Sequence, residues 1–418
     1  GDQAVRNDAG QEALGHYTHA LELTHQLPES PERIEQEIGL QIGLGNALVA
    51  TKGFASDEVE RTFTRARELC REVGETRHLF PVLFGLWTYY FVRAEHRVAI
   101  ELAEQLLVFA ERRRERVPLL IAHRTLGTQM LHLGELPRAR AHLERAIALY
   151  APDFDRPLAF LYNHDPRVAS LSLLAICLYL QGNRAEAEER CKVALAVARE
   201  LGNPASAAFA IGHAAILRQL IGEVEPARET LLAQAQSALV GHEHVAATWH
   251  SFAQVVEAWS LAKEDQLEAA QDLLREAILD LQVAGMSVFW PWVLGVYADL
   301  CEHAGRREEA LAHLHEAIGA SRQSGARVFE ASLLRRRGEL LPEAGVGEGP
   351  EDTPERCFVL AIDRAHEQCA RQFELRAALC LAALPGRSPE SQALLAACRA
   401  RLTGKLDDPA LARLAAGP

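Results

Sequence analysis

The chain lacks a long apolar run, and it lacks an excess of basic residues. Its longest apolar stretch, LSLLAICLYL at 171–180, falls short of the roughly 18 to 20 residues that a membrane-spanning helix needs. No secretory leader is recognisable in the first residues. The formal net charge of −13 is opposite in sign to the basic stripe that nucleic-acid-binding proteins usually carry. We therefore expect a cytoplasmic protein whose partners include neither membrane nor nucleic acid.

Motifs that mark catalysis or metal binding are also missing. The eight cysteines form no Cys-x-x-Cys pair, and several fall at helical core positions, so we expect reduced thiols that behave as small apolar groups. No Gly-x-x-x-x-Gly-Lys-Ser/Thr segment is present to bind phosphate. His242, Glu243 and His244 lack the His-Glu-x-x-His spacing that places two imidazoles on one helical face. The sequence thus predicts no enzyme, no metal site and no cofactor.

What the chain does contain is a pattern that returns about every 40 residues, a period typical of stacked helical repeats. A small residue near the end of one helix is followed by a short turn and then by Ala-x-x-x-Leu-x-x-Ala on the next helix. The second part occurs at Ala139, Leu143, Ala146; at Ala187, Cys191, Ala194; at Ala270, Leu274, Ala277; and at Ala310, Leu314, Ala317. Because one such unit cannot bury its own apolar face, it must stack on its neighbours. The sequence predicts an all-α solenoid of about 9 to 10 helix pairs in a right-handed superhelix.

The breaks in the pattern divide this single solenoid of residues 1–418 into three stretches. We expect irregular repeats over 1–113, regular repeats over 117–323 with an insertion at 151–165, and irregular repeats with a cap over 326–418. The first helices of the regular pairs are expected near 117–133, 166–181, 204–221, 244–263 and 287–304, with turns at Gly134, Gly182, Gly222, Asp265 and Gly305. At such turns a residue that tolerates a left-handed conformation ends the helix.

The spacing of the small residues matches the tetratricopeptide repeat. In the third helix pair, Gly127, Gly134, Ala139, Leu143 and Ala146 occupy the small and large positions that define this repeat. Alanines one turn apart let the second helix approach the first closely. A larger side chain there is expected to overpack the interface.

A wider resemblance covers nearly the whole chain. It is carried by AHRTLGTQMLHLGELPRARAHLERAIALY, the LAFLYNHDPRV insertion, RRRGELL and CFVLAIDRAHEQCARQFELRAALCLAAL. These segments resemble the C-terminal repeats of large bacterial signalling proteins, which join a class III adenylate or guanylate cyclase, a kinase or a transcription-factor module to an ATPase of the AAA or STAND type. The opening GDQAVRNDAGQEALGHYTHALEL is similar to the segment after the ATPase. It also reads as the tail of a helix, and no initiating Met is present, so we expect an excised fragment.

That resemblance implies a regulatory role rather than a catalytic one. The solenoid would bind a ligand or a protein and bias the nucleotide state of the upstream ATPase or cyclase domains of the same chain. This expectation comes from the family alone, because the periodicity establishes only the fold.

The candidate binding residues come from the first helix of each pair, which lines the concave face in such superhelices. The groove positions are Phe84, Thr88, Arg124, Thr128, His132, Ser172, Tyr179, Gln219, Phe252, Trp259, Trp292, Asp299, Glu302, Arg335 and Glu339. Aromatic rings beside a few polar groups are typical of peptide grooves and of small-molecule clefts. Trp259 and Trp292 are equally compatible with simple packing between helices. Arg124 and Arg335 are the stronger candidates, because a buried Arg is costly unless it meets an acid.

The insertion at 151–165 ends in Tyr162, Asn163, His164 and Asp165. Since Asp165 precedes Pro166, we interpret it as the N-cap of the next helix. A contribution of this loop to a ligand site is the alternative.

Three functional classes remain open. The first is a sensor and protein-interaction solenoid that regulates an attached signalling ATPase or cyclase. The second is a stand-alone scaffold that binds peptides in its groove. The third is an enzyme with its site in the groove, which no motif supports. In each case the overall acidic charge favours a protein or peptide, or a small-molecule effector, that is basic or neutral.

Overall fold

The structure is a computed structural model, and it describes residues 10–74, 76–162, 164–222, 245–342, 349 and 351–403. The segment at 1–8 and the group His242, Glu243 and His244 lie outside these residues. All regular secondary structure in the described part is helical. In chain order the helices are α2 (Gly10–His25), α3 (Pro31–Lys52), α4 (Asp57–Val73), α5 (Leu79–Val92), α6 (His96–Arg113), α7 (Arg116–Leu133), α8 (Leu136–Leu149), α9 (Pro152–Asp155), α10 (Leu158–Leu161), α11 (Pro166–Leu180), α12 (Arg184–Leu201), α13 (Pro204–Ile221), α15 (Val245–Lys263), α16 (Leu267–Val283), α17 (Trp290–His303), α18 (Arg307–Ser324), α19 (Glu330–Leu340), α20 (Pro354–Glu367), α21 (Arg371–Ala383) and α22 (Pro389–Leu402).

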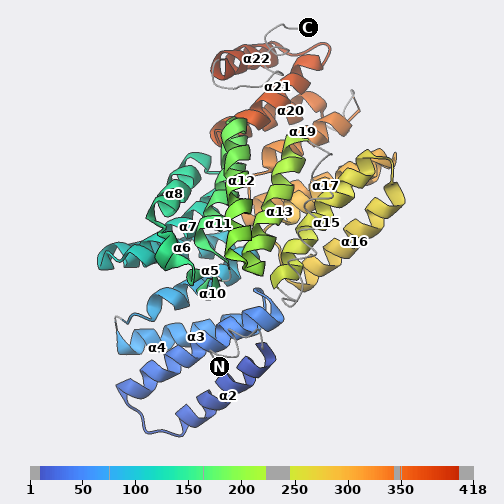
Figure 1. The fold of residues 1–418 in the computed structure, drawn as a ribbon. Coiled ribbons are helices and arrows are strands. Elements are labelled where there is room, and N and C mark those ends of the chain that lie inside the picture. Colours follow the sequence, from blue (N-terminus) through green and yellow to red (C-terminus); the bar gives the residue numbers. More distant parts are fainter. Residues whose placement is uncertain are drawn as a thin grey trace.

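Consecutive helices pack in pairs that stack along the chain, from α2–α4 at one end to α20–α22 at the other (Figure 1). The predicted all-α solenoid is confirmed. The expected turn residues all have positive φ, at 82° for Gly134, 95° for Gly182, 90° for Gly222, 61° for Asp265 and 72° for Gly305. Left-handed backbone is easiest for Gly and tolerable for Asp, so these residues end the first helices where the sequence predicts.

The small residues of the repeat lie at the closest helix contacts. Ala139 and Leu143 are fully buried on α8, and Ala146 is 2% exposed. On the facing helix α7, a Cβ at Gly127 would lie 2.6 Å from Leu143 Cγ. The close packing of α7 against α8 therefore depends on Gly127, which has no side chain, and on the small side chains of Ala139 and Ala146.

The insertion forms two single helical turns, α9 and α10, before α11 begins. The Asp165 carboxylate accepts hydrogen bonds from the backbone N–H groups of Arg167 and Val168, both at 2.9 Å, which confirms its predicted role as N-cap. Its other oxygen accepts from the Tyr150 hydroxyl at 2.6 Å. The cap therefore fixes the end of the insertion against the end of α8.

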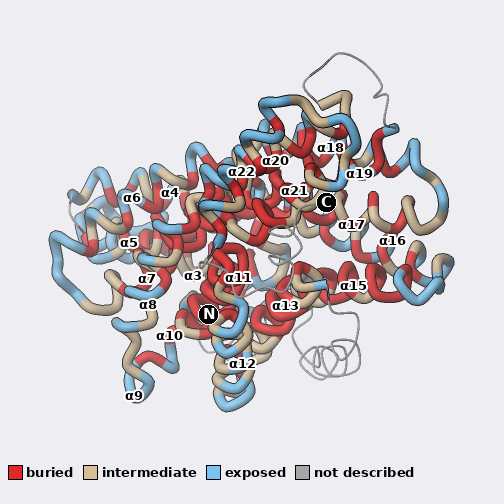
Figure 2. Tube along the Cα trace, turned by 90° about the horizontal axis from the view of Figure 1, so that it is seen from above, coloured by how far each residue is buried: buried red, intermediate tan, exposed pale blue. Residues whose placement is uncertain are grey.

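Segments about five repeats apart meet across the inside of the superhelix, as expected where stacked repeats complete a turn. The carbonyl oxygen of Val92, at the end of α5, accepts from the backbone N–H groups of Ser287 and Val288 at 2.8 and 3.0 Å. The His132 carbonyl at the end of α7 accepts from Val328 N–H at 3.2 Å. Arg371 Nη1 donates to the Gln181 carbonyl after α11 at 3.4 Å. Figure 2 shows the result, with buried chain in the interior and exposed chain at the outer helix ends.

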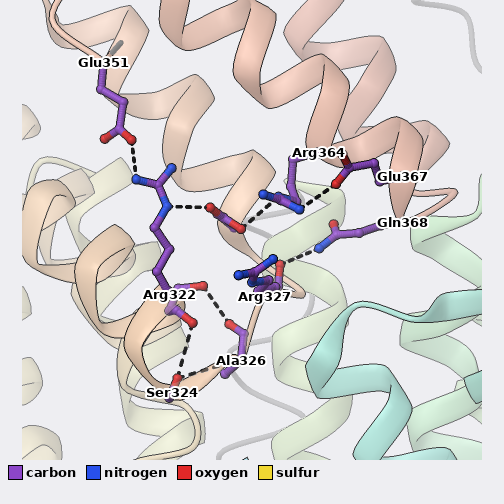
Figure 3. A network of polar contacts seen from close by, with 10 residues as sticks. Arg322, Ser324, Ala326, Arg327, Glu351, Arg364, Glu367 and Gln368 are labelled. Carbon is purple, nitrogen blue, oxygen red and sulfur yellow. Dashed lines mark hydrogen bonds and ion pairs between the residues drawn. The ribbon is translucent and has the colours of Figure 1, made fainter. Parts of the chain in front are cut away.

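A buried carboxylate joins α18, α19 and α20. Glu330 is fully buried and accepts from Arg322 Nε at 2.7 Å, while Arg364 Nε lies 2.9 Å from its second oxygen. Figure 3 shows Arg322 and Arg364 approaching this point from different helices. Gln368 extends the network by donating to the Arg327 carbonyl at 2.7 Å.

Within the described residues, no helix combines the length and the apolar character required to cross a bilayer.

Candidate functional site

A cleft of about 690 Å³ lies where α13, α15, α17, α19 and α21 converge. The predicted residues Gln219, Trp259, Trp292, Asp299 and Arg335 all line it. These residues come from successive first helices of the repeats, so the stacking itself brings them together. We call this region the cleft.

The two tryptophans of the cleft are packed more deeply than an open groove would require. Trp259 is 5% exposed and Trp292 is 4% exposed, so most of each ring lies between helices. Trp292 Nε1 donates to Gln219 Oε1 at 3.3 Å, and the Lys263 ammonium lies 5.8 Å from the centre of the Trp259 ring. This agrees with the alternative that the sequence left open, in which Trp259 and Trp292 pack between helices. The rings form the apolar floor of the cleft, and polar groups form its rim.

An ion-pair network covers one wall of the cleft. Arg336 Nη2 lies 2.7 Å from Asp299 Oδ1 and also contacts Glu302, and Arg336 Nη1 lies 2.5 Å from Glu339. Burial opposes the charge on Arg336, but these carboxylates outweigh it and raise the pKa of Arg336 above its usual value. Arg335 is paired with Glu339 one turn along α19. The acids of the cleft are therefore already paired with Arg336 and Arg335.

Two cations of the cleft have no such neutralisation. Lys263 and Arg376 line it, and within the described residues neither lies in an ion pair with a carboxylate. Lys263 is exposed at the end of α15. Arg376 donates from Nη2 to the Tyr179 hydroxyl oxygen at 2.7 Å and to the Leu220 carbonyl at 2.8 Å, both neutral acceptors. The cleft is locally positive although the chain as a whole is acidic.

The remaining predicted residues lie elsewhere. Phe84, Thr88, Arg124, Thr128 and His132 line a second cavity of about 50 Å³, which we call the chamber. Arg124, Thr128 and His132 are 3%, 5% and 4% exposed, so this part of the inner surface is enclosed and is not an open groove. Most of the predicted groove residues thus divide between two cavities, whereas Ser172, Phe252 and Glu339 belong to the described lining of neither.

Tyr179 belongs to the described lining of neither cavity. It lies on α11, which follows α7 of the chamber and precedes α15 of the cleft in the chain. It is buried, and its hydroxyl donates to the Leu220 carbonyl at 2.9 Å. Its contact with Arg376 makes it a support for the cleft.

Several residues of these cavities were not singled out from the sequence. In the cleft they are Lys263, Arg336 and Arg376, and in the chamber they are Trp87, His213 and Phe289. Tyr162 and His164 also line the chamber, and the sequence had named both in the insertion whose contribution to a ligand site was the alternative. Arg336 adjoins Arg335 in the RRR run, which was the available signal. Arg376 lies in an irregular repeat where the spacing assigns no groove position.

The described part of the chain contains no group of three His, Cys, Asp or Glu side chains arranged to hold a metal ion. All eight cysteines are free, and Cys70, Cys177, Cys301, Cys357 and Cys398 are buried. Burial raises the pKa of Cys177 to about 12, so this thiol stays protonated at neutral pH.

Comparison with known proteins agrees with the fold. No protein-family model matches the chain. A curated but uncharacterized protein of Rhizobium meliloti (strain 1021) is 24% identical over 381 residues, which are 90% of this chain and 36% of that protein. The chain therefore spans about a third of the length of that relative.

Among solved structures, the Rap protein complexed with Competence and Sporulation Factor is similar with a TM-score of 0.52 and 13% identity, over 81% of this chain and 94% of that one. Yeast Tom70 matches with a TM-score of 0.28 and 15% identity, over 99% of this chain and 96% of that one. The helix pairs and the likeness to Rap define a tetratricopeptide-like α-solenoid. At this level of identity the likeness concerns the fold alone.

Proposed function

We propose that this chain is a non-catalytic sensor and interaction region that binds a peptide or a small effector in the cleft. The observation that carries the proposal is the composition of that cleft. Trp259 and Trp292 supply an apolar floor, while Lys263 and Arg376 supply positive charge that no acid of the described chain neutralises. A cleft with rings for burial and a few convergent polar groups for orientation suits a ligand that is partly apolar.

The local charge indicates the chemistry of that ligand. Asp299 and Glu302 are paired with Arg336, so a bound acid would meet Lys263 and Arg376 without displacing a carboxylate from either of them. We therefore infer that the ligand carries a carboxylate, such as an acidic side chain or a peptide C-terminus. The similar Rap protein was solved with Competence and Sporulation Factor bound, which supports a ligand inside this type of solenoid.

We further propose that the chain acts as the regulatory repeat region of a larger bacterial signalling protein in the cytoplasm. The longer Rhizobium meliloti relative and the resemblance of the repeats to those that follow AAA or STAND ATPases support this context. In it, ligand binding would bias the nucleotide state of the attached ATPase or cyclase. The division of the solenoid into irregular, regular and irregular stretches remains part of this proposal.

A binding measurement tests the cleft. Isothermal titration with a panel of mixed-sequence peptides, each prepared with a free and with an amidated C-terminus, is expected to find binding that depends on the free carboxylate. Lys263→Glu reverses one charge at the rim without changing the core. It is expected to lower the affinity for the peptides that bind by about tenfold or more. Lys192→Glu is the matched control, because Lys192 is exposed on α12 outside the cleft. Equal losses in both variants would exclude the cleft as the binding site.

The second candidate is a stand-alone peptide-binding scaffold. It is favoured by the fact that helices between α13 and α21 supply the described lining of the cleft. The two candidates are separated by an experiment on the larger signalling protein that contains these repeats. A peptide found to bind the cleft is added to that protein. A peptide-dependent change in ATP hydrolysis or cyclase activity supports the regulatory region, whereas binding without any change supports the scaffold.

A further inference from the structure

The chamber is a second site, and it is independent of the function proposed for the cleft. It lies between α5, α7, the residues that follow α10, and α13, and the segment at 286–289 closes it from the distant side of the superhelix. Phe84, Trp87 and Phe289 contribute apolar walls, and Arg124 is its only Arg or Lys among the described lining residues.

Arg124 is a buried cation without an acid partner. Its side chain is enclosed, and within the described residues no carboxylate forms an ion pair with it. Burial lowers the pKa of Arg124 to about 10, so the group remains charged at neutral pH. Asp165 acts on it only through space, because its carboxylate oxygens already accept from Arg167 N–H, Val168 N–H and the Tyr150 hydroxyl. A buried charge of this kind is normally paired.

Among the described residues that line the chamber, the buried polar atoms without a partner are all hydrogen-bond donors. Arg124 Nη2 donates to His164 Nε2 at 2.7 Å, which places the single imidazole proton of neutral His164 on Nδ1. Burial keeps the pKa of His164 well below its usual value, so the ring is neutral. His164 Nδ1, Arg124 Nε, Arg124 Nη1 and Trp87 Nε1 are buried without a partner in the described chain. A set made only of donors, one of them cationic, is complementary to an anion.

The threonine hydroxyls of the chamber form their hydrogen bonds with backbone carbonyls and not with these donors. The Thr88 hydroxyl donates to the Phe84 carbonyl at 3.0 Å, and the Thr128 hydroxyl donates to the Arg124 carbonyl at 2.9 Å. Both side chains are thereby turned toward their own helices.

The guanidinium also presents a flat edge. Nη2 uses one of its two hydrogens on His164, so one edge of the fork keeps both of its N–H groups, either with Nε or with Nη1. Its plane is held by the rings of Phe84 and Trp87, whose centres lie 5.5 and 5.8 Å from Arg124 Cζ. Two parallel N–H groups fit a planar oxyanion better than a spherical ion.

We propose that the chamber binds a small carboxylate, gripped by the free edge of Arg124 and by the N–H groups of Trp87 and His164. Its volume of about 50 Å³ exceeds several times the roughly 10 to 15 Å³ that one water needs, which leaves room for a group of the size of formate or acetate. The carboxylate belongs either to a free small acid or to the end of a longer ligand.

The test is a thermal-shift and calorimetric titration of the protein with sodium formate and sodium acetate, with sodium chloride at equal ionic strength as the reference. The carboxylates are expected to raise Tm in a saturable way, and chloride is not. Longer carboxylates, such as butyrate and phenylacetate, separate the two sources. Binding that ends at acetate indicates a free small acid, and binding that continues indicates the end of a longer ligand.

Variants assign the effect to the chamber. Arg124→Met keeps the length of the side chain and is expected to abolish the carboxylate response, while Arg124→Lys keeps the charge without the fork and is expected to weaken acetate by about tenfold. Arg145→Met is the matched control, because Arg145 is exposed on α8 outside the chamber, and it should respond like the wild type. Trp87→Phe removes one donor but keeps an aromatic ring. This variant should weaken acetate binding severalfold, and it tests the proposal if the Arg124 variants fail to fold.

Three results overturn the proposal. One is the absence of any carboxylate response in the wild-type protein, another is an equal response to chloride, and the third is a response that survives both Arg124→Met and Trp87→Phe.

Discussion

Arg376 on α21 donates from Nη2 to the hydroxyl oxygen of Tyr179 on α11 at 2.7 Å, although the two residues are 197 positions apart in the chain. The same guanidinium nitrogen donates to the Leu220 carbonyl at the end of α13. Tyr179 in turn donates to that carbonyl at 2.9 Å. These bonds join helices of separate repeats across the inside of the superhelix. They satisfy a helix-end carbonyl that would otherwise be left over inside the protein.

Arg376→Ala is expected to lower the free energy of unfolding by about 1 to 3 kcal/mol, because it removes two hydrogen bonds that a charged group donates inside the protein. Tyr179→Phe should cost about 1 kcal/mol. Urea denaturation of both variants and of the double variant measures the coupling. Additive losses would show that the two side chains do not act together. Arg190→Ala, which breaks only a surface pair on α12, is the control.

Two glycines in helix interiors are expected to respond in opposite ways to alanine. Gly127→Ala places a Cβ 2.6 Å from Leu143 Cγ and 3.1 Å from the Leu143 backbone nitrogen, and should destabilise by about 1 to 3 kcal/mol through overpacking. Gly319 on α18 has no atom within 4 Å of its added Cβ, so Gly319→Ala should stabilise by about 0.5 to 1 kcal/mol. Thermal denaturation distinguishes them, and a stabilising Gly127→Ala would contradict the close packing of α7 on α8.

Acid is expected to destabilise the chain through its buried histidines. Burial lowers the pKa of His96 and of His213 to about 4 and keeps the pKa of His132 well below the usual value. In the unfolded chain these groups titrate near pH 6.5. Between about pH 6.5 and 4 the unfolded state therefore binds protons that the folded state does not, and stability falls as the pH falls. Each group contributes about 1.4 kcal/mol per pH unit in that window.

Urea denaturation at pH 7.5, 6 and 5 checks this dependence. His132→Phe should reduce the dependence of the free energy of unfolding on pH by an amount equal to the uptake of up to one proton. The ring centre of His132 lies 4.9 Å from that of Phe91 and 5.0 Å from that of Phe289, so a phenyl ring suits the same place. A slope that His132→Phe does not alter would show that burial does not lower the pKa of this ring.

Removal of the buried carboxylate of Glu330 is expected to be among the most damaging single changes. Glu330→Ala leaves Arg322 and Arg364 facing one another without the acid between them, and should cost about 3 to 5 kcal/mol. Glu188→Ala breaks an exposed pair with Arg184 on α12 and should cost less than about 1 kcal/mol. Denaturation curves of the two variants give the comparison. Equal losses would mean that the enclosed carboxylate contributes no more than a surface one.

The sequence by itself determined the helix pairs, their turns and one cap. These features are local: a left-handed turn needs Gly or a tolerant residue such as Asp265, a close helix contact needs Ala139 and Ala146, and Asp165 before a proline caps the next helix. Each can be recognised within one repeat. The spacing also identified which helices face inward, and this is why residues as different as Arg124 and Trp292 could be named in advance.

Only the tertiary structure decided what those inward residues do. The small rotation between successive repeats accumulates along the stack, and its sum brings Val92 to Ser287 and Tyr179 to Arg376, which no local pattern encodes. That sum encloses Arg124 in a chamber where no described residue is an acid partner for it, and it leaves Trp292 at the floor of a wider cleft. The spacing gave both residues the same status because it records which face of a helix a side chain occupies. Enclosure depends instead on which distant repeat packs against that face.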